Sequence, residues 1–209
     1  MPDTFSSDSF RERCDELAAA DADLAAIVLR YGYPPMWNRP NTFETLVHFI
    51  LEQQVSLASA LAALNKLRER LGEVTPEGVL LLSDEELKAC YCSRQKIAYI
   101  RYLAESVTKR ETDLQLMPSL PDEGVRTALT ALKGIGNWTA DVYLIFVLRR
   151  TDIFPAGDLA AVNALKEIKH IPKDTSREDI LRIAGHWRPH RTVATMLLWH
   201  HYLSSRGRK

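Results

Sequence analysis

The chain has 209 residues, of which 46% are hydrophobic and 26% charged, and its formal net charge is zero. This composition excludes a disordered or fibrous protein, and the length allows one domain with a sizeable core. Three cysteines, Cys14, Cys90 and Cys92, are too few for a disulfide framework. The longest apolar run, residues 142–148, is too short to span a membrane, and the polar N-terminus lacks an apolar signal core. We therefore expect no membrane partner and a cytoplasmic protein (in the nucleoid region of a bacterium, or nuclear in a eukaryote).

The zero net charge hides an uneven distribution along the chain. From Lys133 to the end there are 13 Lys and Arg against 7 Asp and Glu, whereas the first 132 residues hold 14 against 20. The C-terminal part is therefore basic, which suits a partner that carries phosphates. A chance fluctuation in solvated surface charge is the alternative.

The predicted elements are almost all helical. Residues 1–9 are expected to be disordered, and residues 10–30 have helical periodicity without breakers. The loop at 31–40 contains three prolines, which remove backbone donors, and Asn41 or Thr42 caps the helix that follows it. Further helices are expected at 57–71, 76–82, 84–90, 94–109, 122–132, 137–149, 159–169, 176–185 and 189–204. No strand pattern is convincing, so the sequence predicts an all-α protein with about ten helices.

The stretch from residue 131 to residue 158 has the features of an anion site followed by a carboxylate. Residues 132–136, Leu-Lys-Gly-Ile-Gly, form a tight turn in which Gly134 and Gly136 allow positive φ and close backbone approach. The helix from about Asn137 then presents unpaired N–H groups, which can bind a nucleic-acid phosphate. Asp158 follows Trp138 by twenty residues and precedes another helix.

These residues resemble a known family. The run Leu-Lys-Gly-Ile-Gly-Asn-Trp-Thr-Ala, with Asp158 twenty residues past Trp138, is similar to the helix-hairpin-helix DNA glycosylase superfamily, within it the alkylbase (3-methyladenine) DNA glycosylase II group. Matches at 43–56, 96–104 and 186–194 extend the resemblance over about residues 30–205. It implies one catalytic domain over residues 1–209, built of two helical lobes with a cleft between them. The hairpin motif would lie at residues 122–149.

By this resemblance Asp158 is the catalytic residue. Cleavage of an N-glycosidic bond passes through a transition state with oxocarbenium character, which needs a negative charge and a positioned water. Asp158 is also an obvious N-cap for the helix at Leu159, and most Asp residues in that position do only that. The two roles are compatible, because a helix N-terminus favours the ionised carboxylate.

The residue at position 138 distinguishes two subclasses of the family. Members that also cut the DNA backbone carry a Lys here as an amine nucleophile. Trp138 cannot form a Schiff base, so the resemblance implies a monofunctional enzyme in which water is the nucleophile. Lys133, in the turn, is expected to meet phosphate or solvent.

Aromatic residues are expected to form the base pocket. Purines alkylated at N3 or N7 are cationic and are attracted to the faces of electron-rich rings. Core packing is the alternative for each of these side chains. The resemblance places Trp138 and Trp199 in the pocket, with Tyr143, Trp37 and Trp187 as weaker candidates.

The remaining contacts would be with DNA. In the family, the turn after the helix that begins near Phe43 carries a side chain that fills the gap left by the flipped base, and Gln54 occupies that position. Alternatively, Gln53 and Gln54 cap helix ends. Glu52 stands where relatives often have Gly. Arg191 is expected to support the active-site loop or to meet phosphates. The expected DNA-binding residues are Gln54, Lys133, Gly134, Gly136, Asn137, Thr139 and Arg191.

We expect no required cofactor. No group of His, Cys and carboxylate residues has zinc-site spacing, and no cysteine follows Cys92 to form the late quartet that holds an iron–sulfur cluster in some relatives. The family hairpin often holds a monovalent cation through main-chain carbonyls. Here these would be the carbonyls of Thr130, Leu132 and Ile135, holding Na⁺ or K⁺ as a structural bridge to phosphate.

The sequence therefore predicts a monofunctional DNA glycosylase that removes alkylated purines, of the 3-methyladenine and 7-methylguanine type, in base excision repair by base flipping. Its partner would be double-stranded DNA containing alkylated bases, and the protein would act as a monomer. One alternative is a non-catalytic module that binds damaged DNA. Another is a glycosylase of other purine-lesion specificity.

Overall fold

The computed structural model describes residues 2–207, and this part of the chain is helical throughout. Its strand pairing is limited to an isolated bridge between Thr4 and Arg150. The all-α expectation is confirmed, although the described residues contain twelve α-helices and not about ten, and none of these helices is long and apolar enough to cross a membrane. The helices are α1 Ser7–Ala20, α2 Ala22–Tyr31, α3 Phe43–Glu52, α4 Leu57–Leu71, α5 Pro76–Leu81, α6 Asp84–Ala89, α7 Arg94–Thr108, α8 Asp122–Thr130, α9 Asn137–Phe146, α10 Leu159–Ile168, α11 Arg177–Gly185 and α12 Arg191–Ser205, with a 3₁₀ turn at Met117–Ser119.

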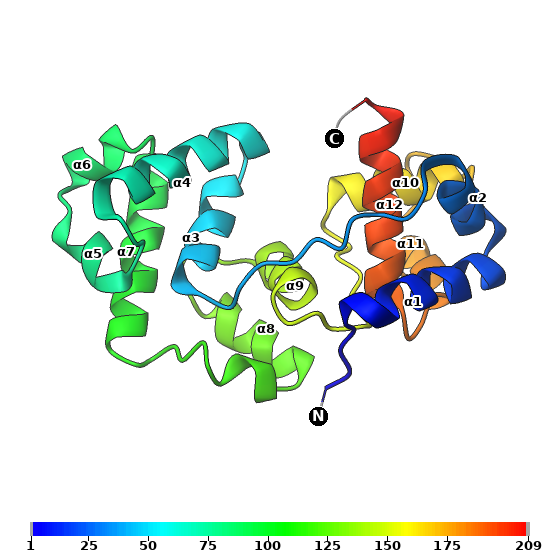
Figure 1. Cartoon of the computed structure of the whole chain (residues 1–209), viewed down its shortest axis with the longest axis horizontal. Helices are drawn as coiled ribbons and strands as arrows, with labels where there is room; N and C mark the ends of the chain where they lie inside the picture. Colours follow the sequence, from blue (N-terminus) through cyan, green and yellow to red (C-terminus); the bar gives the residue numbers. More distant parts are fainter. Residues whose placement is uncertain (1, 208–209) are drawn as a thin grey trace. The chain divides into compact units, whose positions relative to one another are not determined.

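The chain divides into two compact units. Unit 1 comprises the described parts of Met1–Asn38 and Leu144–Lys209, and unit 2 comprises Arg39–Tyr143. Figure 1 shows that unit 1 brings together the blue N-terminal helices and the yellow-to-red C-terminal ones, whereas unit 2 is the continuous cyan-to-green stretch. These are the two helical lobes that the sequence predicts; the cleft expected between them stays a prediction.

The N-terminal segment is ordered, contrary to the expectation for residues 1–9, of which Met1 lies outside the described part. Ser6 caps α1 through a capping box with Ser9, the Phe5 side chain is buried, and the Phe5 N–H donates to the Arg149 carbonyl at 3.1 Å. The apolar side chain of Phe5 therefore ties this segment to unit 1.

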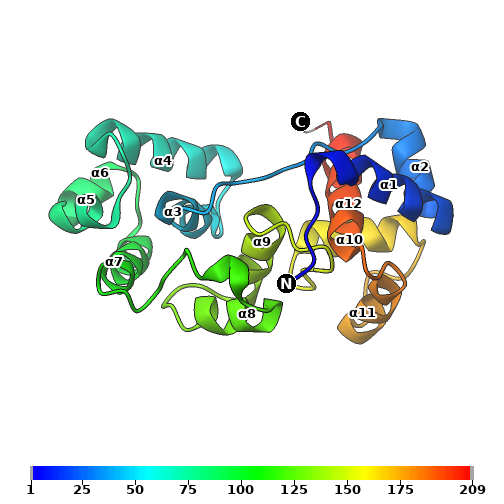
Figure 2. The same cartoon turned by 60° about the horizontal axis from the view of Figure 1, so that its bottom comes forward.

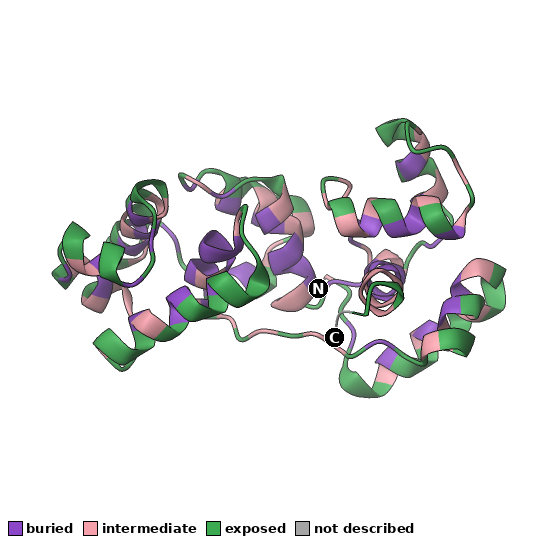
Figure 3. Ribbon diagram, turned by 90° about the horizontal axis from the view of Figure 1, so that it is seen from above, coloured by how far each residue is buried: buried purple, intermediate pink, exposed green. Residues whose placement is uncertain are grey.

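The core of unit 1 forms around α12. This helix packs against α1, α2 and α10, and in both Figure 1 and Figure 2 it lies among them. Its residues 192–198 are all buried. Elsewhere buried positions alternate with exposed ones along the helices, as Figure 3 shows, which is the pattern of amphipathic helices that share a core.

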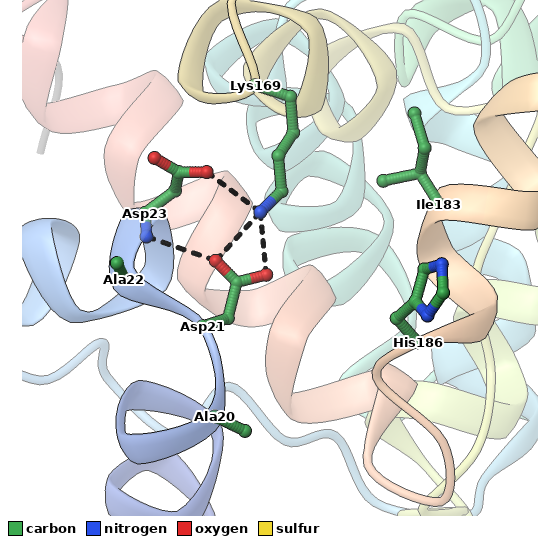
Figure 4. A pocket seen from close by; sticks show the side chains of 7 residues that line it. All are labelled: Ala20, Asp21, Ala22, Asp23, Lys169, Ile183 and His186. Atoms are coloured by element: carbon green, nitrogen blue, oxygen red, sulfur yellow. Dashed lines mark hydrogen bonds and ion pairs between the residues drawn. The ribbon is translucent and has the colours of Figure 1, made fainter.

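The helix expected over residues 10–30 is broken at Asp21. The Asp21 carboxylate caps α2 by accepting hydrogen bonds from the Asp23 and Leu24 N–H groups. The same carboxylate accepts hydrogen bonds from Lys169 Nζ, at 2.7 and 2.8 Å, and from Trp187 Nε1, at 2.7 Å. Figure 4 shows Lys169 held between Asp21 and Asp23 beside a cavity of about 520 Å³. An interior Asp with so many partners stabilises the break between α1 and α2.

The Asp21–Lys169 pair predicts a defined pH window of stability. Burial alone would raise the pKa of Asp21, but hydrogen bonds from Lys169 and Trp187 outweigh it and lower this pKa. Burial opposes the charge of Lys169 too, yet the bonds to Asp21 and Asp23 raise its pKa. A lowered carboxyl pKa stabilises the fold above its unfolded value, and a raised lysine pKa stabilises it below its unfolded value, so the pair contributes fully between about pH 5 and pH 9.

We therefore expect Lys169→Met to lower the free energy of unfolding by about 2 kcal/mol at pH 7, because a largely buried carboxylate loses its cation. The difference from wild type should shrink as the pH falls through the lowered pKa of Asp21 or rises through the raised pKa of Lys169. Urea unfolding at pH 3, pH 7 and about pH 11.5, above the unfolded pKa of lysine, measures it, with the exposed Lys173→Met as control. A loss that is equal at all three pH values contradicts this account.

Unit 2 forms around α3 and α7. Helix α3 packs against α4 and α7, and α7 also contacts α5 and α6. The short helices begin at good caps, such as Thr75 before Pro76 and the capping box of Ser83 with Glu86. Two further helices, α8 and α9, form the predicted hairpin.

Candidate active site

Asp158 lies at the N-terminus of α10 in unit 1, where it caps the helix as the sequence predicts. Its Oδ1 accepts a hydrogen bond from the Ala161 N–H at 2.8 Å. The same oxygen accepts one from Trp199 Nε1 on α12 at 2.9 Å. The carboxylate is therefore fixed by its own helix and by an aromatic side chain 41 positions away.

Trp199 belongs to a group of rings beside this carboxylate. Its ring lies 5.3 Å from that of Phe146 and 6.4 Å from that of Trp37, centroid to centroid, the latter pair edge to face. All three side chains are half-buried, and we call them the aromatic cluster. It contains two of the predicted pocket residues. Phe146 is new: it lies in the apolar run 142–148, where the sequence gives no sign that one residue differs from the core.

The loop before Asp158 is held by the first turns of α12. Arg191 donates to both carboxylate oxygens of Asp152, at 2.6 and 2.9 Å, and to its carbonyl at 2.8 Å. Thr192 Oγ1 donates to the Arg150 carbonyl and accepts from the Ile153 N–H, and Thr195 Oγ1 lies 3.4 Å from the Ile153 carbonyl. Helix α12 thus supports both this loop and, through Trp199, the catalytic candidate.

This arrangement gives Arg191 a structural role and adds two supporting residues, Thr192 and Thr195. Arg191 supports the loop, one of its two expected roles, through its bonds to Asp152; its contact with DNA stays a prediction. Thr192 and Thr195 are fully buried, and the sequence does not reveal them, because a hydroxyl on an apolar helix face has no local signature.

Two other pocket candidates are core residues. Tyr143 is fully buried, and its hydroxyl donates to Asn41 Oδ1 at 2.6 Å within unit 2. Trp187 is buried too, with its indole N–H on Asp21. Both rings are buried in this structure, and their place in the base pocket stays a prediction. Trp138 lies half-buried in unit 2, and its place in the pocket stays a prediction.

The hairpin turn, residues 131–136, joins α8 to α9 in unit 2. Gly134 adopts a left-handed φ of 88°, and a Cβ there would lie 2.2 Å from the ring of Tyr99 on α7. The Leu132 and Ile135 side chains point inward and are buried. Arg126 on α8 donates to Asp141 on α9 at 2.9 Å, which braces the two helices. The turn is thus held from within, while its outer residues Lys133 and Gly136, and Asn137 directly after it, are exposed.

Thr139, another predicted DNA contact, is only 2% exposed. Its Oγ1 lies 3.4 Å from Gln53 Nε2, which donates to the Gly134 carbonyl at 2.9 Å. The Thr139 side chain therefore faces the interior of unit 2, and a contact of this residue with DNA stays a prediction. Gly134 is partly exposed and stays a DNA-binding candidate beside the exposed residues of the turn.

Gln54 occupies a strained position in the turn between α3 and α4, residues 52–55, which we call the wedge turn. Gln53 has φ −61° and ψ 123°, Gln54 has φ 59°, and the Val55 N–H lies 3.5 Å from the Glu52 carbonyl, as in a type II β-turn. The third position of such a turn favours Gly, so a glutamine there costs about 1 kcal/mol. The exposed Gln54 does not cap either helix: Ser56 caps α4.

The cysteines are buried thiols. Burial raises the pKa of Cys14 to about 12 and that of Cys92 to about 11. Thiols with such values stay protonated and pack as small apolar groups. Residues 2–207 contain no group of three or more His, Cys, Asp or Glu side chains arranged to hold a metal ion.

The hairpin carbonyls fit a monovalent cation in one respect. The Leu132 carbonyl accepts the Ile135 N–H at 3.0 Å and keeps a second lone pair. The carbonyls of Thr130 and Ile135 accept no hydrogen bond from the described residues. Oxygen ligands of this kind suit hard cations.

Comparison with known proteins places these features in a family. Residues 47–189 match the model of the HhH-GPD superfamily of base excision DNA repair proteins. The chain belongs to this superfamily. The matched range contains the wedge turn, the hairpin and Asp158, so the expected superfamily is confirmed.

Curated relatives and solved structures of other proteins are similar to this chain over most of its length. DNA-3-methyladenine glycosylase 1 of Schizosaccharomyces pombe is 30% identical over 185 residues, covering 84% of this chain and 79% of the relative. A DNA-3-methyladenine glycosidase from Bacillus halodurans superposes with a TM-score of 0.80 at 30% identity, over 98% of this chain and 94% of that one. The Schizosaccharomyces pombe 3-methyladenine DNA glycosylase in complex with abasic DNA gives 0.78 at 28% identity, over 90% and 95%.

Proposed function

We propose that this HhH-GPD protein is a monofunctional DNA glycosylase that hydrolyses the N-glycosidic bond of alkylated purines in duplex DNA. The observation that carries the proposal is the Asp158 carboxylate, hydrogen-bonded to Trp199 of the aromatic cluster. The relatives named as 3-methyladenine glycosylases and the one bound to abasic DNA support the substrate class and the DNA partner.

Each part of the arrangement has a chemical role in this proposal. The faces of the cluster rings attract the cationic base. As the glycosidic bond breaks, positive charge develops on the sugar, and the ionised Asp158 stabilises it and orients the attacking water. The α10 N-terminus and the Trp199 N–H hold the carboxylate in place. With Trp at position 138, no lysine amine stands there for a lyase step.

The hairpin turn would hold the DNA backbone. The exposed residues Gly136 and Asn137 stand at the N-terminus of α9, where backbone N–H groups and the charge of the exposed Lys133 suit a phosphate. A Na⁺ or K⁺ on the carbonyls of Thr130, Leu132 and Ile135 would add positive charge beside that phosphate. Gln54, at the tip of the wedge turn, would fill the gap left by the flipped base.

The direct test is release of free base from methylated duplex DNA by the wild-type protein, with undamaged duplex as control and a binding assay in parallel. We expect 3-methyladenine and 7-methylguanine in solution, an abasic product strand, and no covalent adduct after borohydride treatment. Binding without release of any base would replace the proposal with a damaged-DNA-binding module. Release of oxidised purines alone would change the lesion class.

Because Gln54 has a strained φ, we expect its replacement by Gly to change the rate of base release without a large change in stability. Gln54→Gly relieves a left-handed φ but adds freedom to the unfolded chain, so the free energy of unfolding should change by less than about 1 kcal/mol. The rate of base release should fall about tenfold, since no side chain then fills the gap and offsets the cost of unstacking the flipped base. Gln54→Leu, which restores bulk at the same φ, should retain most of the release rate. If Gln54→Gly releases base at the wild-type rate, Gln54 does not fill the gap left by the flipped base.

A further inference from the structure

The wedge turn and the hairpin turn are joined by one side chain. Gln53 follows α3, and its Nε2 donates to the Gly134 carbonyl at 2.9 Å and lies 3.4 Å from Thr139 Oγ1. Gly134 is in the hairpin turn and Thr139 in the first turn of α9. The amide of Gln53 therefore connects two segments of unit 2 that are 81 positions apart in the sequence.

Two further contacts fix the base of the wedge turn. Lys96 on α7 donates from Nζ to the Leu51 carbonyl at 2.6 Å. The guanidinium of Arg39 makes two hydrogen bonds, at 2.6 and 2.9 Å, to the Glu52 carboxylate, which is largely buried. An ion pair between Arg39 and Glu52 therefore holds the end of α3. These contacts anchor α3, whereas Gln53 alone among them reaches the hairpin.

This arrangement sets the geometry of the two turns that touch DNA in the proposed function. Gln54 carries its side chain outward from a strained φ, which persists only where the surrounding structure holds the backbone. The preceding residue, Gln53, supplies that restraint through its hydrogen bond to the hairpin turn. A shift of about 1 Å between catalytic parts can slow a reaction by about a hundredfold, so the separation of the two turns matters to the rate.

We propose that Gln53 is a positioning residue: it keeps the wedge turn in register with the hairpin turn, so that phosphate binding by the hairpin and insertion of Gln54 occur together. The inference rests on the proposed function. Gln53 itself touches neither base nor sugar in this account; it acts through Gln54.

The variants follow from the chemistry of the amide. Gln53→Met keeps the length of the side chain and removes its donor. Gln53→Glu keeps the shape, but an ionised carboxylate cannot donate to the Gly134 carbonyl and repels it; a protonated carboxyl can donate again. Gln115→Met makes the same chemical change at an exposed site of unit 2 and is the matched control.

Two measurements separate positioning from support of the fold. The first uses a duplex with a tetrahydrofuran abasic site and 2-aminopurine opposite it, whose fluorescence reports insertion of the wedge. The second is single-turnover base release from methylated duplex DNA. Affinity for undamaged duplex and the thermal unfolding midpoint are measured on the same samples.

We expect Gln53→Met to bind undamaged duplex within about twofold of wild type while the fluorescence change and the release rate each fall about tenfold, as loss of one well-placed hydrogen bond predicts. Gln53→Glu should show the same defect at neutral pH and recover, relative to wild type, as the pH falls and its carboxyl protonates. Gln115→Met should match wild type throughout.

Three results would overturn the inference: wild-type fluorescence and release by Gln53→Met, an equal loss of affinity for undamaged duplex, or no recovery of Gln53→Glu at low pH. The first removes any role of Gln53, and the second makes it only a support of the hairpin. The third removes the role of its donated hydrogen bond. If wild type gives the fluorescence change but releases no base, the proposed activity fails, and the fluorescence of the variants still decides the positioning role.

Discussion

Replacing Asp158 with Asn should lower the single-turnover rate of base release by at least about a hundredfold, because the charge that stabilises the transition state is lost. The fold should be unaffected. Asn is as good an N-cap as Asp, and its Oδ1 can still accept the Ala161 and Trp199 N–H groups that hold the wild-type carboxylate. The free energy of unfolding should therefore change by less than about 0.5 kcal/mol, and duplex affinity should be retained.

Asp158→Ala separates the two roles of this residue further. It removes both the charge and the cap, so it should be as inactive as Asp158→Asn and in addition lose about 1 kcal/mol of stability. Asp174→Asn, at an exposed carboxylate on the same unit, serves as control for a simple change of charge. If Asp158→Asn releases base at the wild-type rate, Asp158 is a helix cap and no more.

Local patterns predicted those elements whose cause is local. Ser83 with Glu86, Thr75 with Pro76, and Asp158 before Leu159 each cap a helix through atoms within three positions in the sequence. The break at Asp21 was not predictable in this way. An Asp within an alanine-rich helical run gives a weak signal, and its partners Lys169 and Trp187 are more than 140 positions away.

The same reason explains which local features of the candidate site could be predicted from the sequence. The left-handed turn at Gly134 and the helix cap at Asp158 are set by local backbone geometry, which sequence spacing conveys, whereas the positive φ allowed for at Gly136 is not adopted. Whether a polar or aromatic side chain faces solvent or core depends on distant partners. The side chain of Thr139 is hydrogen-bonded to Gln53, that of Arg191 to Asp152, and that of Tyr143 to Asn41. The two residues of each pair are far apart in the sequence.

The hairpin allows a sharp comparison between its two glycines. Gly134 has a left-handed φ and lies against Tyr99, whereas a Cβ on Gly136 would meet no atom within 4 Å and its φ is not in the left-handed region. Gly134→Ala therefore combines backbone strain with overlap of the ring, and we expect it to lower the free energy of unfolding by about 2–4 kcal/mol. Its duplex affinity should fall as well, since the Gly134 carbonyl that receives Gln53 would move.

Gly136→Ala is the matched control for this prediction, because it adds the same methyl group to the same turn, directly before α9. It should cost less than about 1 kcal/mol of stability, the loss expected for Ala against Gly at a helix start. If it still weakens duplex binding, the exposed outer face of the turn is where the phosphate approaches. Urea unfolding and duplex titration of both variants decide the matter: equal stability losses would mean that the contact with Tyr99 does not hold the turn, and that the hairpin is maintained by Leu132 and Ile135 instead.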